Sequence, residues 1–130
     1  MDAETAACRW AETWSRAWPQ RDGEAIVALY ADSAVYRSTA FGQPYLGLAG
    51  VRRYLSENFP AEENIECWFG QPIVSGGRAA VEWWGCWTEQ GQELTFAGVT
   101  VLRFDSQGQV VDHRDYDNHV AWREQPYAAW

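Results

Sequence analysis

Lysine is absent from this chain of 130 residues, and ten arginines are its only strongly basic side chains. Eighteen Asp and Glu residues give a formal net charge of −8 at pH 7. Binding to nucleic acid or to an anionic membrane surface requires clustered basic side chains, whereas the arginines are scattered along the sequence. We therefore expect no nucleic-acid partner and no membrane partner.

Cysteines and long apolar runs are also scarce. The three cysteines, Cys8, Cys67 and Cys86, are odd in number and widely spaced, which favours a reducing cytoplasm over a disulfide framework or a zinc site. No stretch reaches the roughly 18 apolar residues of a membrane-spanning helix, and the acidic opening Met1–Glu4 is unlike a signal peptide. No repeat, linker or low-complexity segment interrupts the chain, so we expect one domain over residues 1–130.

Aromatic residues are abundant, and nine of them are tryptophans. Trp10, Trp14 and Trp18 recur at every fourth position, which predicts an amphipathic helix over residues 3–18 that carries an aromatic stripe. Pro19 is expected to end this helix. Rigid aromatic surfaces in such number suggest the walls of a cavity as well as a core.

The remaining pattern predicts two more helices followed by a meander of strands. The second helix is capped by Asp22 and continues to about Tyr30, and the third follows Gly47 and ends before Pro60. The strands are expected at residues 34–37, 65–74, 78–89, 93–104 and 109–118. Helices that precede an antiparallel meander predict an α+β fold with helices on one face of a curved sheet.

The last of these strands carries most of the acid/base potential of the C-terminal half. Side chains alternate between the two faces of a strand. The predicted strand at 109–118 therefore places His113, Asp115 and Asp117 on one face, and it places Asp112, Arg114 and Tyr116 on the other.

Asp115 is the main candidate for a catalytic residue, with His113 assisting it through a shared proton. Burial beside indole rings favours proton transfer by a carboxyl group, because it destabilises the charged form. Two structural alternatives remain open: Asp115 pairs with an arginine such as Arg37, and His113 is a rim residue bonded to the backbone. Ligands two residues apart on a flat strand converge poorly on a metal, so we expect neither a metal nor another cofactor.

Three segments resemble a known superfamily. They are Asp22–Asp32, the loop Phe41–Pro44 with Gly47, and Leu102–Asp105 followed by Gly108. Their order is similar to that of NTF2-like (SnoaL-like) proteins. The resemblance implies an NTF2-like cone-shaped barrel, in which three N-terminal helices pack on a curved, mainly antiparallel sheet. This fold hosts isomerases, dehydratases, cyclases, epoxide hydrolases and non-enzymes, so it does not specify the chemistry.

The family's catalytic patterns match this sequence only in part. The steroid isomerases of this superfamily carry Tyr, Asp and a second acid at the positions of Trp14, Ser38 and Thr100, so we expect no ketosteroid isomerase activity. Arg114–Tyr116 resembles a motif of limonene-type epoxide hydrolases, but the Arg-x-Asp pair of that family is missing from the strand at 78–89. SnoaL-like polyketide cyclases place an acidic base on the last strand, and Asp115 is the matching position.

The sequence thus predicts a deep aromatic pocket for a small, mainly apolar molecule. Two functions remain open: a cofactor-independent acid/base enzyme (isomerase, dehydratase, cyclase or epoxide hydrolase-like), and a non-catalytic ligand-binding or accessory module. Beside Asp115 and His113, the residues expected to contact the ligand are Trp14, Trp18, Tyr36, Tyr54, Trp83, Trp87, Thr100 and Asp117. Gly85 lies between two tryptophans of its strand and leaves room for another group to approach.

The face of the sheet opposite the pocket is predicted to form an interface. Glu82, Trp84 and Cys86 alternate with the pocket residues on the strand at 78–89, and an outward tryptophan is costly in a monomer. We therefore expect a homodimer through this outer face. The apolar tail at 119–130 is expected to dock on a rim of the domain or on the partner subunit.

Overall fold

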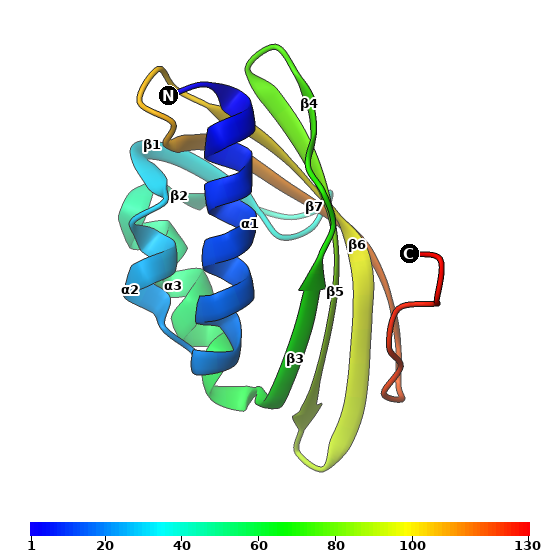
Figure 1. Ribbon diagram of the computed structural model, residues 1–130. Coiled ribbons are helices and arrows are strands. Elements are labelled where there is room, and N and C mark those ends of the chain that lie inside the picture. The colour runs from blue at the N-terminus through cyan, green and yellow to red at the C-terminus, as the bar shows by residue number, and fades with distance from the viewer.

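The computed structural model describes all residues from 1 to 130 and has the predicted α+β architecture. The helices are α1 (Ala3–Gln20), α2 (Gly23–Val27) and α3 (Gly47–Asn58), and a 3-10 turn, η1 (Phe59–Ala61), follows α3. The strands are β1 (Tyr30–Arg37), β2 (Tyr45–Leu46), β3 (Glu63–Phe69), β4 (Ile73–Ser75), β5 (Arg78–Glu89), β6 (Gln92–Phe104) and β7 (Val110–Val120). Figure 1 shows the three helices on one side of the sheet.

The strands form one sheet in the order β2-β1-β7-β6-β5-β3, with β4 paired to β5. All pairings are antiparallel except that between β1 and β7, which is parallel. The expected mainly antiparallel sheet is therefore confirmed. The sheet is open, however, because its end strands β2 and β3 do not pair with each other. The cone shape that the resemblance implied stays a prediction.

The first helix is longer than predicted, because Pro19 lies within its last turn rather than after it. A proline cannot donate the hydrogen bond that the carbonyl of Ser15 would receive from position 19. The thiol of Cys67 lies 3.6 Å from that carbonyl and donates to it instead. The helix ends two residues later at Arg21, which adopts a left-handed conformation with φ of 53°.

Two other predicted boundaries are also wrong. The second helix ends at Val27, and Tyr30 begins β1 rather than closing that helix. The tyrosine hydroxyl turns into the core and meets His113 of β7. The strand expected at 65–74 is divided into β3 and β4, since Pro72 in the intervening segment cannot donate to a strand ladder.

The aromatic stripe of α1 packs against the inner face of the sheet. Trp10, Trp14 and Trp18 are all at most 7% exposed, and Trp18 meets Trp83 edge-on with ring centroids 6.1 Å apart. The space that Gly85 leaves on β5 is filled by this indole, because a Cβ atom at Gly85 would lie 2.2 Å from the Trp18 ring. The absence of a side chain at Gly85 thus leaves room for the Trp18 ring, and α1 packs closely against β5.

The C-terminal tail, residues 121–130, lies on the outer face of the sheet, away from the helices (Figure 1). Arg123 donates to Glu66 and Glu93, in both cases over 2.7 Å, and covers the thiol of Cys86. The ring of Tyr127 meets Trp84 edge-on at 6.0 Å. The chain's own tail therefore covers part of the surface on which we expected a partner subunit, and the homodimer stays a prediction.

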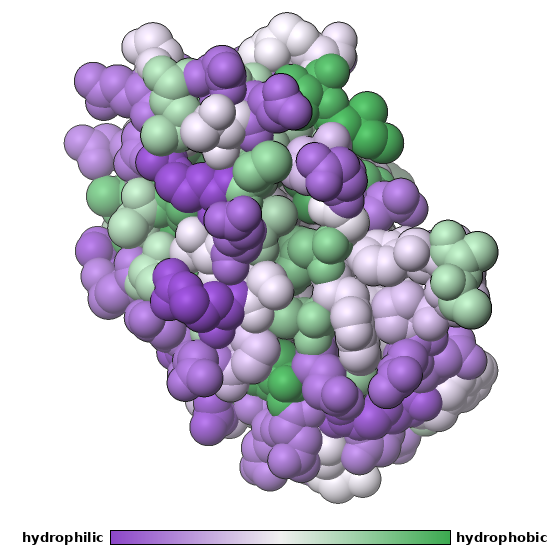
Figure 2. Space-filling view, in the orientation of Figure 1, coloured by the Kyte–Doolittle hydropathy of each residue, from purple (hydrophilic) through white to green (hydrophobic).

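Figure 2 shows the molecule in the orientation of Figure 1, with the helices on the left and the sheet on the right. Its surface is largely hydrophilic, and the most hydrophobic area in this view lies over β4, where Ile73 is 67% exposed. None of the helices combines the length and the apolar composition needed to cross a lipid bilayer.

Substitution of Gly85 by alanine tests the contact between α1 and β5. We expect the free energy of unfolding to fall by about 1–3 kcal/mol, because the added methyl group overlaps a buried indole. Gly77→Ala is the matched control, since a Cβ at Gly77 meets no atom within 4 Å. Urea unfolding of both variants measures the difference. Equal stabilities would show that Trp18 does not seat on Gly85.

Candidate functional site

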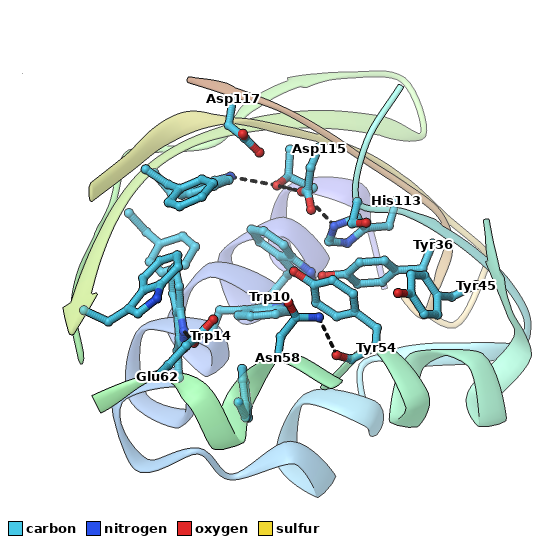
Figure 3. A pocket seen from close by; sticks show the side chains of 18 residues that line it. Trp10, Trp14, Tyr36, Tyr45, Tyr54, Asn58, Glu62, His113, Asp115 and Asp117 are labelled. Carbon is cyan, nitrogen blue, oxygen red and sulfur yellow. Dashed lines mark hydrogen bonds and ion pairs between the residues drawn. The ribbon is translucent and has the colours of Figure 1, made fainter. Parts of the chain in front are cut away.

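A cavity of about 290 Å³ lies between the helices and the inner face of the sheet (Figure 3). All ten residues predicted to form the site are among the eighteen that line it. Sequence reasoning missed the other eight: Trp10, Ser38, Tyr45, Asn58, Phe59, Glu62, Phe69 and Phe96. The alternation predicted for β7 is therefore correct, since His113, Asp115 and Asp117 face the cavity together. The functional roles assigned to these residues stay predictions.

The carboxylate of Asp115 is held through one of its two oxygens. The Thr100 hydroxyl donates to Oδ1 over 2.7 Å, and His113 Nε2 lies 2.8 Å from the same atom. The protein makes no hydrogen bond to Oδ2. The alternative pairing with Arg37 does not occur, because Arg37 lies 3.7 Å from Asp112 on the outer face. Asp115 thus has one fixed oxygen and one free oxygen.

His113 is buried, with 1% of its surface exposed, and is not a rim residue. Its Nδ1 lies 2.9 Å from the hydroxyl of Tyr30, which itself accepts a hydrogen bond from Trp10 Nε1 over 3.1 Å. The imidazole also stacks on the ring of Tyr36, with centroids 3.7 Å apart and an angle of 17° between the planes. Tertiary contacts therefore hold the ring on both edges and on one face.

The direction of these hydrogen bonds assigns the proton of His113. Trp10 can only donate, so Tyr30 accepts from it and has its own proton available for His113 Nδ1. A neutral imidazole with its proton on Nε2 then donates to Asp115 Oδ1. A doubly protonated ring would donate to Tyr30 instead and leave the buried tyrosine proton without an acceptor, which is unfavourable. The network is satisfied by a neutral His113 that donates from Nε2 to Asp115 Oδ1.

A second hydrogen-bond path supports Asp115 from the other side. Trp83 Nε1 donates to Thr100 Oγ1 over 2.8 Å, and the threonine hydroxyl donates a hydrogen bond to Asp115. Both Thr100 and Trp83 were predicted as ligand contacts. Their side chains also fix the carboxylate, because the Thr100 hydroxyl accepts from Trp83 and donates to Asp115.

Several polar groups in the cavity wall are uncharged donors. Burial raises the pKa of Tyr36 and of Tyr54 well above the ordinary range, so both hydroxyls keep their protons. The indole N–H of Trp14 is buried and has no hydrogen-bond partner. An unpaired buried donor is costly in a protein, and a ligand oxygen would satisfy it. The steroid isomerase position at Trp14 thus keeps a donor, although not a tyrosine.

Glu62 is the functional candidate that sequence reasoning missed. It follows η1 and lies across the cavity from Asp115 (Figure 3). Its side chain accepts a hydrogen bond from Trp18 Nε1 over 2.8 Å, and burial raises the pKa of this carboxyl to about 7. No local pattern distinguishes it from the exposed Glu63, since only the path of the chain after η1 turns one of the two inward.

Asp117 lies at the exposed margin of the cavity, and partial burial together with the charge of Asp115 raises its pKa. Its neighbour His119 stacks on Phe96, with ring centroids 4.9 Å apart. No group of three or more His, Cys, Asp or Glu side chains converges as metal ligands would.

Comparison with known proteins places the fold. The epoxide hydrolase/cyclase-like enzyme SalBIII, with a role in pyran ring formation in the polyether salinomycin, has a TM-score of 0.80 at 19% identity and covers 93% of this chain and 98% of its own. RV0760c from Mycobacterium tuberculosis has a TM-score of 0.76 at 17% identity, covering 92% and 97%. A hypothetical protein with a ketosteroid isomerase-like fold from Catenulispora acidiphila, in complex with trimethylamine, has a TM-score of 0.71 at 19% identity, covering 81% and 82%.

At these identities the solved structures establish a common fold and leave the chemistry open. No curated protein matches the chain. The sequence profile of the SnoaL-like domain matches residues 11–113, which include every strand named above from β1 to β6 and the first part of β7. With most of its length matched by that profile, the chain belongs to the SnoaL-like family.

Proposed function

We propose that the chain is a cofactor-independent acid/base enzyme that acts on a small, mainly apolar molecule, with Asp115 as the general base. The asymmetric environment of the Asp115 carboxylate carries this proposal. Thr100 and His113 occupy Oδ1, and Oδ2 makes no bond to the protein. A carboxylate that is fixed in this way can take a proton from a molecule in the cavity without moving.

His113 acts as a positioning residue in this proposal. Its side chain is 2% exposed and lines the cavity beside Asp115. Its hydrogen bond holds the carboxylate in one rotamer, and the neutral imidazole stays available to stabilise the carboxyl group as the proton arrives. Tyr30 holds the imidazole in turn, so Tyr30 acts on the substrate only through His113 and Asp115.

Glu62 supplies the complementary acid. With a pKa of about 7, a large fraction of this carboxyl group is protonated near neutral pH. Two carboxyl groups in different environments commonly divide the roles of acid and base between them. Asp115 would remove a proton on one side of the substrate while Glu62 protonates the oxygen that departs on the other side.

Ring closure or epoxide opening fits this pair well. Asp115 takes the proton of a hydroxyl group or water, the freed oxygen attacks the epoxide carbon, and the C–O bond of the epoxide breaks. The departing oxygen then receives the Glu62 proton, and exchange with solvent restores both carboxyl groups. The likeness in fold to SalBIII supports this class of reaction, and isomerisation or dehydration would use the same two groups. Ketosteroid isomerisation is not proposed, because Trp14, Ser38 and Thr100 lack the acids and the tyrosine that it needs.

Asp115→Asn tests the general base. The asparagine keeps an oxygen acceptor for Thr100 but cannot take a proton, so we expect kcat to fall by about 10²–10⁴-fold with little change in KM. A panel of small hydroxy-epoxides and β-hydroxy ketones, followed by NMR of the products, identifies the substrate for this comparison. Asp32→Asn is the control, since Asp32 is exposed and does not line the cavity.

Unchanged turnover in Asp115→Asn would contradict the assignment of the base. Saturable binding of panel members with no turnover of any of them would favour the alternative function, a binding module that only holds its ligand. Circular dichroism and thermal unfolding of each variant distinguish either result from a loss of fold.

Glu62→Gln tests the buried acid through stability. Because the pKa of Glu62 rises from 4.5 to about 7 on folding, the folded protein binds this proton more tightly, and stability falls as the pH rises through this range. The loss amounts to roughly 3 kcal/mol at most. The uncharged glutamine still accepts from Trp18, so its advantage in urea unfolding should grow between about pH 5 and about pH 8.5.

Glu63→Gln is the matched control for this measurement, because Glu63 is the exposed neighbour. It should show no growing advantage with pH. If the two variants behave alike, Glu62 ionises normally in the folded protein and does not serve as the acid.

A further inference from the structure

A cluster of arginines lies on the outer face of the sheet beside the cavity. Arg37, Arg103 and Arg114 approach Asp112 at 3.7, 3.6 and 2.8 Å. Three positive charges thus surround one negative charge, in a chain whose formal net charge is −8. Asp112 neutralises only one of them, and the side chains of Arg37 and Arg114 remain 42% and 40% exposed.

The sheet register brings two of these arginines together. Arg37 is the last residue of β1 and pairs directly with Arg114 of β7. Beyond this pair β1 ends, whereas β7 continues to Val120 with only β6 beside it. The sheet therefore has an opening next to the two guanidinium groups, and neither of them donates a hydrogen bond to the protein apart from its ion pair with Asp112.

A cleft of about 310 Å³ occupies this opening, and Arg37, Thr39, Ala40, Arg114, Asp115 and Tyr116 line it. Asp115 lines both the cleft and the aromatic cavity. Ser38, which lies between two residues of the cleft, also lines the cavity. The two spaces therefore both border Asp115, the proposed general base.

We propose that Arg37 and Arg114 form a binding site for an oxyanion, a carboxylate or a phosphate, carried by the substrate whose apolar part fills the aromatic cavity. Each guanidinium has five N–H donors in a planar arrangement suited to either group. The inner cavity holds the carboxyl groups of Asp115, Asp117 and Glu62, which would repel an anion. The anionic end of the substrate is therefore directed outward to the arginines.

This inference rests on the proposed function, because it gives the substrate of the same cavity a chemical class and an orientation. The substrate is then an amphiphilic acid or phosphate ester rather than a neutral hydrocarbon derivative. The reacting atoms lie beside Asp115, one short chain length from the anionic group. The cleft is partly exposed, so the contribution of the arginines should decrease as salt is added.

Binding of inert probes tests the oxyanion site without any turnover. The probes are 3-phenylpropionate, its neutral amide 3-phenylpropionamide, and 2-phenylethyl phosphate, and calorimetry gives their dissociation constants. We expect the wild type to bind at least one of the two anions about tenfold more tightly than the amide. Which anion binds more tightly distinguishes a carboxylate from a phosphate as the natural group.

Arg37→Gln and Arg114→Gln should each remove most of this preference and leave the affinity for the amide unchanged. Arg103→Gln is the matched control, because Arg103 contacts the same Asp112 but does not line the cleft. Equal or absent binding of anions and amide in the wild type would overturn the inference. So would an equal loss of preference in all three variants, since a general effect of charge would then explain it. Neither result depends on turnover, so failure here is distinguishable from failure of Asp115 as the base.

Discussion

A single run of hydrogen bonds joins five of the elements that line the cavity. It leads from Trp10 through Tyr30 and His113 to Asp115, and returns through Thr100 to Trp83. Its six side chains come from α1, β1, β7, β6 and β5. Each is largely buried, so a break would leave a polar group unpaired at a cost of about 1–3 kcal/mol. The run thus links α1 to the sheet through Trp10, and it links β1 to β7 beside their parallel pairing.

The features predicted correctly from the sequence are those that depend on a local period. The alternation along β7 and the four-residue spacing of the tryptophans in α1 specify which side chains face inward. They do so without information about the elements that pack opposite these side chains. The residues that these inward-facing side chains contact come from distant segments of the chain. Tyr30 is separated from His113 by 83 positions, and no local pattern at Tyr30 shows that it belongs to a strand. The same limitation hides Glu62, whose neighbour Glu63 has the same chemistry and an exposed position.

The outer face of the sheet shows a different limit of sequence reasoning. The pattern on β5 correctly indicates a surface that needs a cover, because Trp84 and Cys86 alternate with the cavity residues. The fact that an apolar surface needs a cover does not specify whether the same chain or a partner subunit covers it. Here Arg123 and Tyr127 of the same chain lie on that surface, and backbone groups of the tail bond to Thr95. The area left for a second copy is smaller than the sequence alone suggests.

Three carboxyl groups near the cavity have different neighbours, and this difference suits them to different roles. Asp112 lies outside among arginines, Asp115 lies on the rim with two hydrogen-bond donors, and Glu62 lies inside with a single indole donor. The number of positive charges and hydrogen-bond donors around the carboxyl group therefore decreases in a gradient from the outer face toward the interior. A molecule with an anionic end and an apolar body has one favourable orientation in such a gradient. That orientation places the middle of the molecule at Asp115 and its inner end near a carboxyl group that can donate a proton.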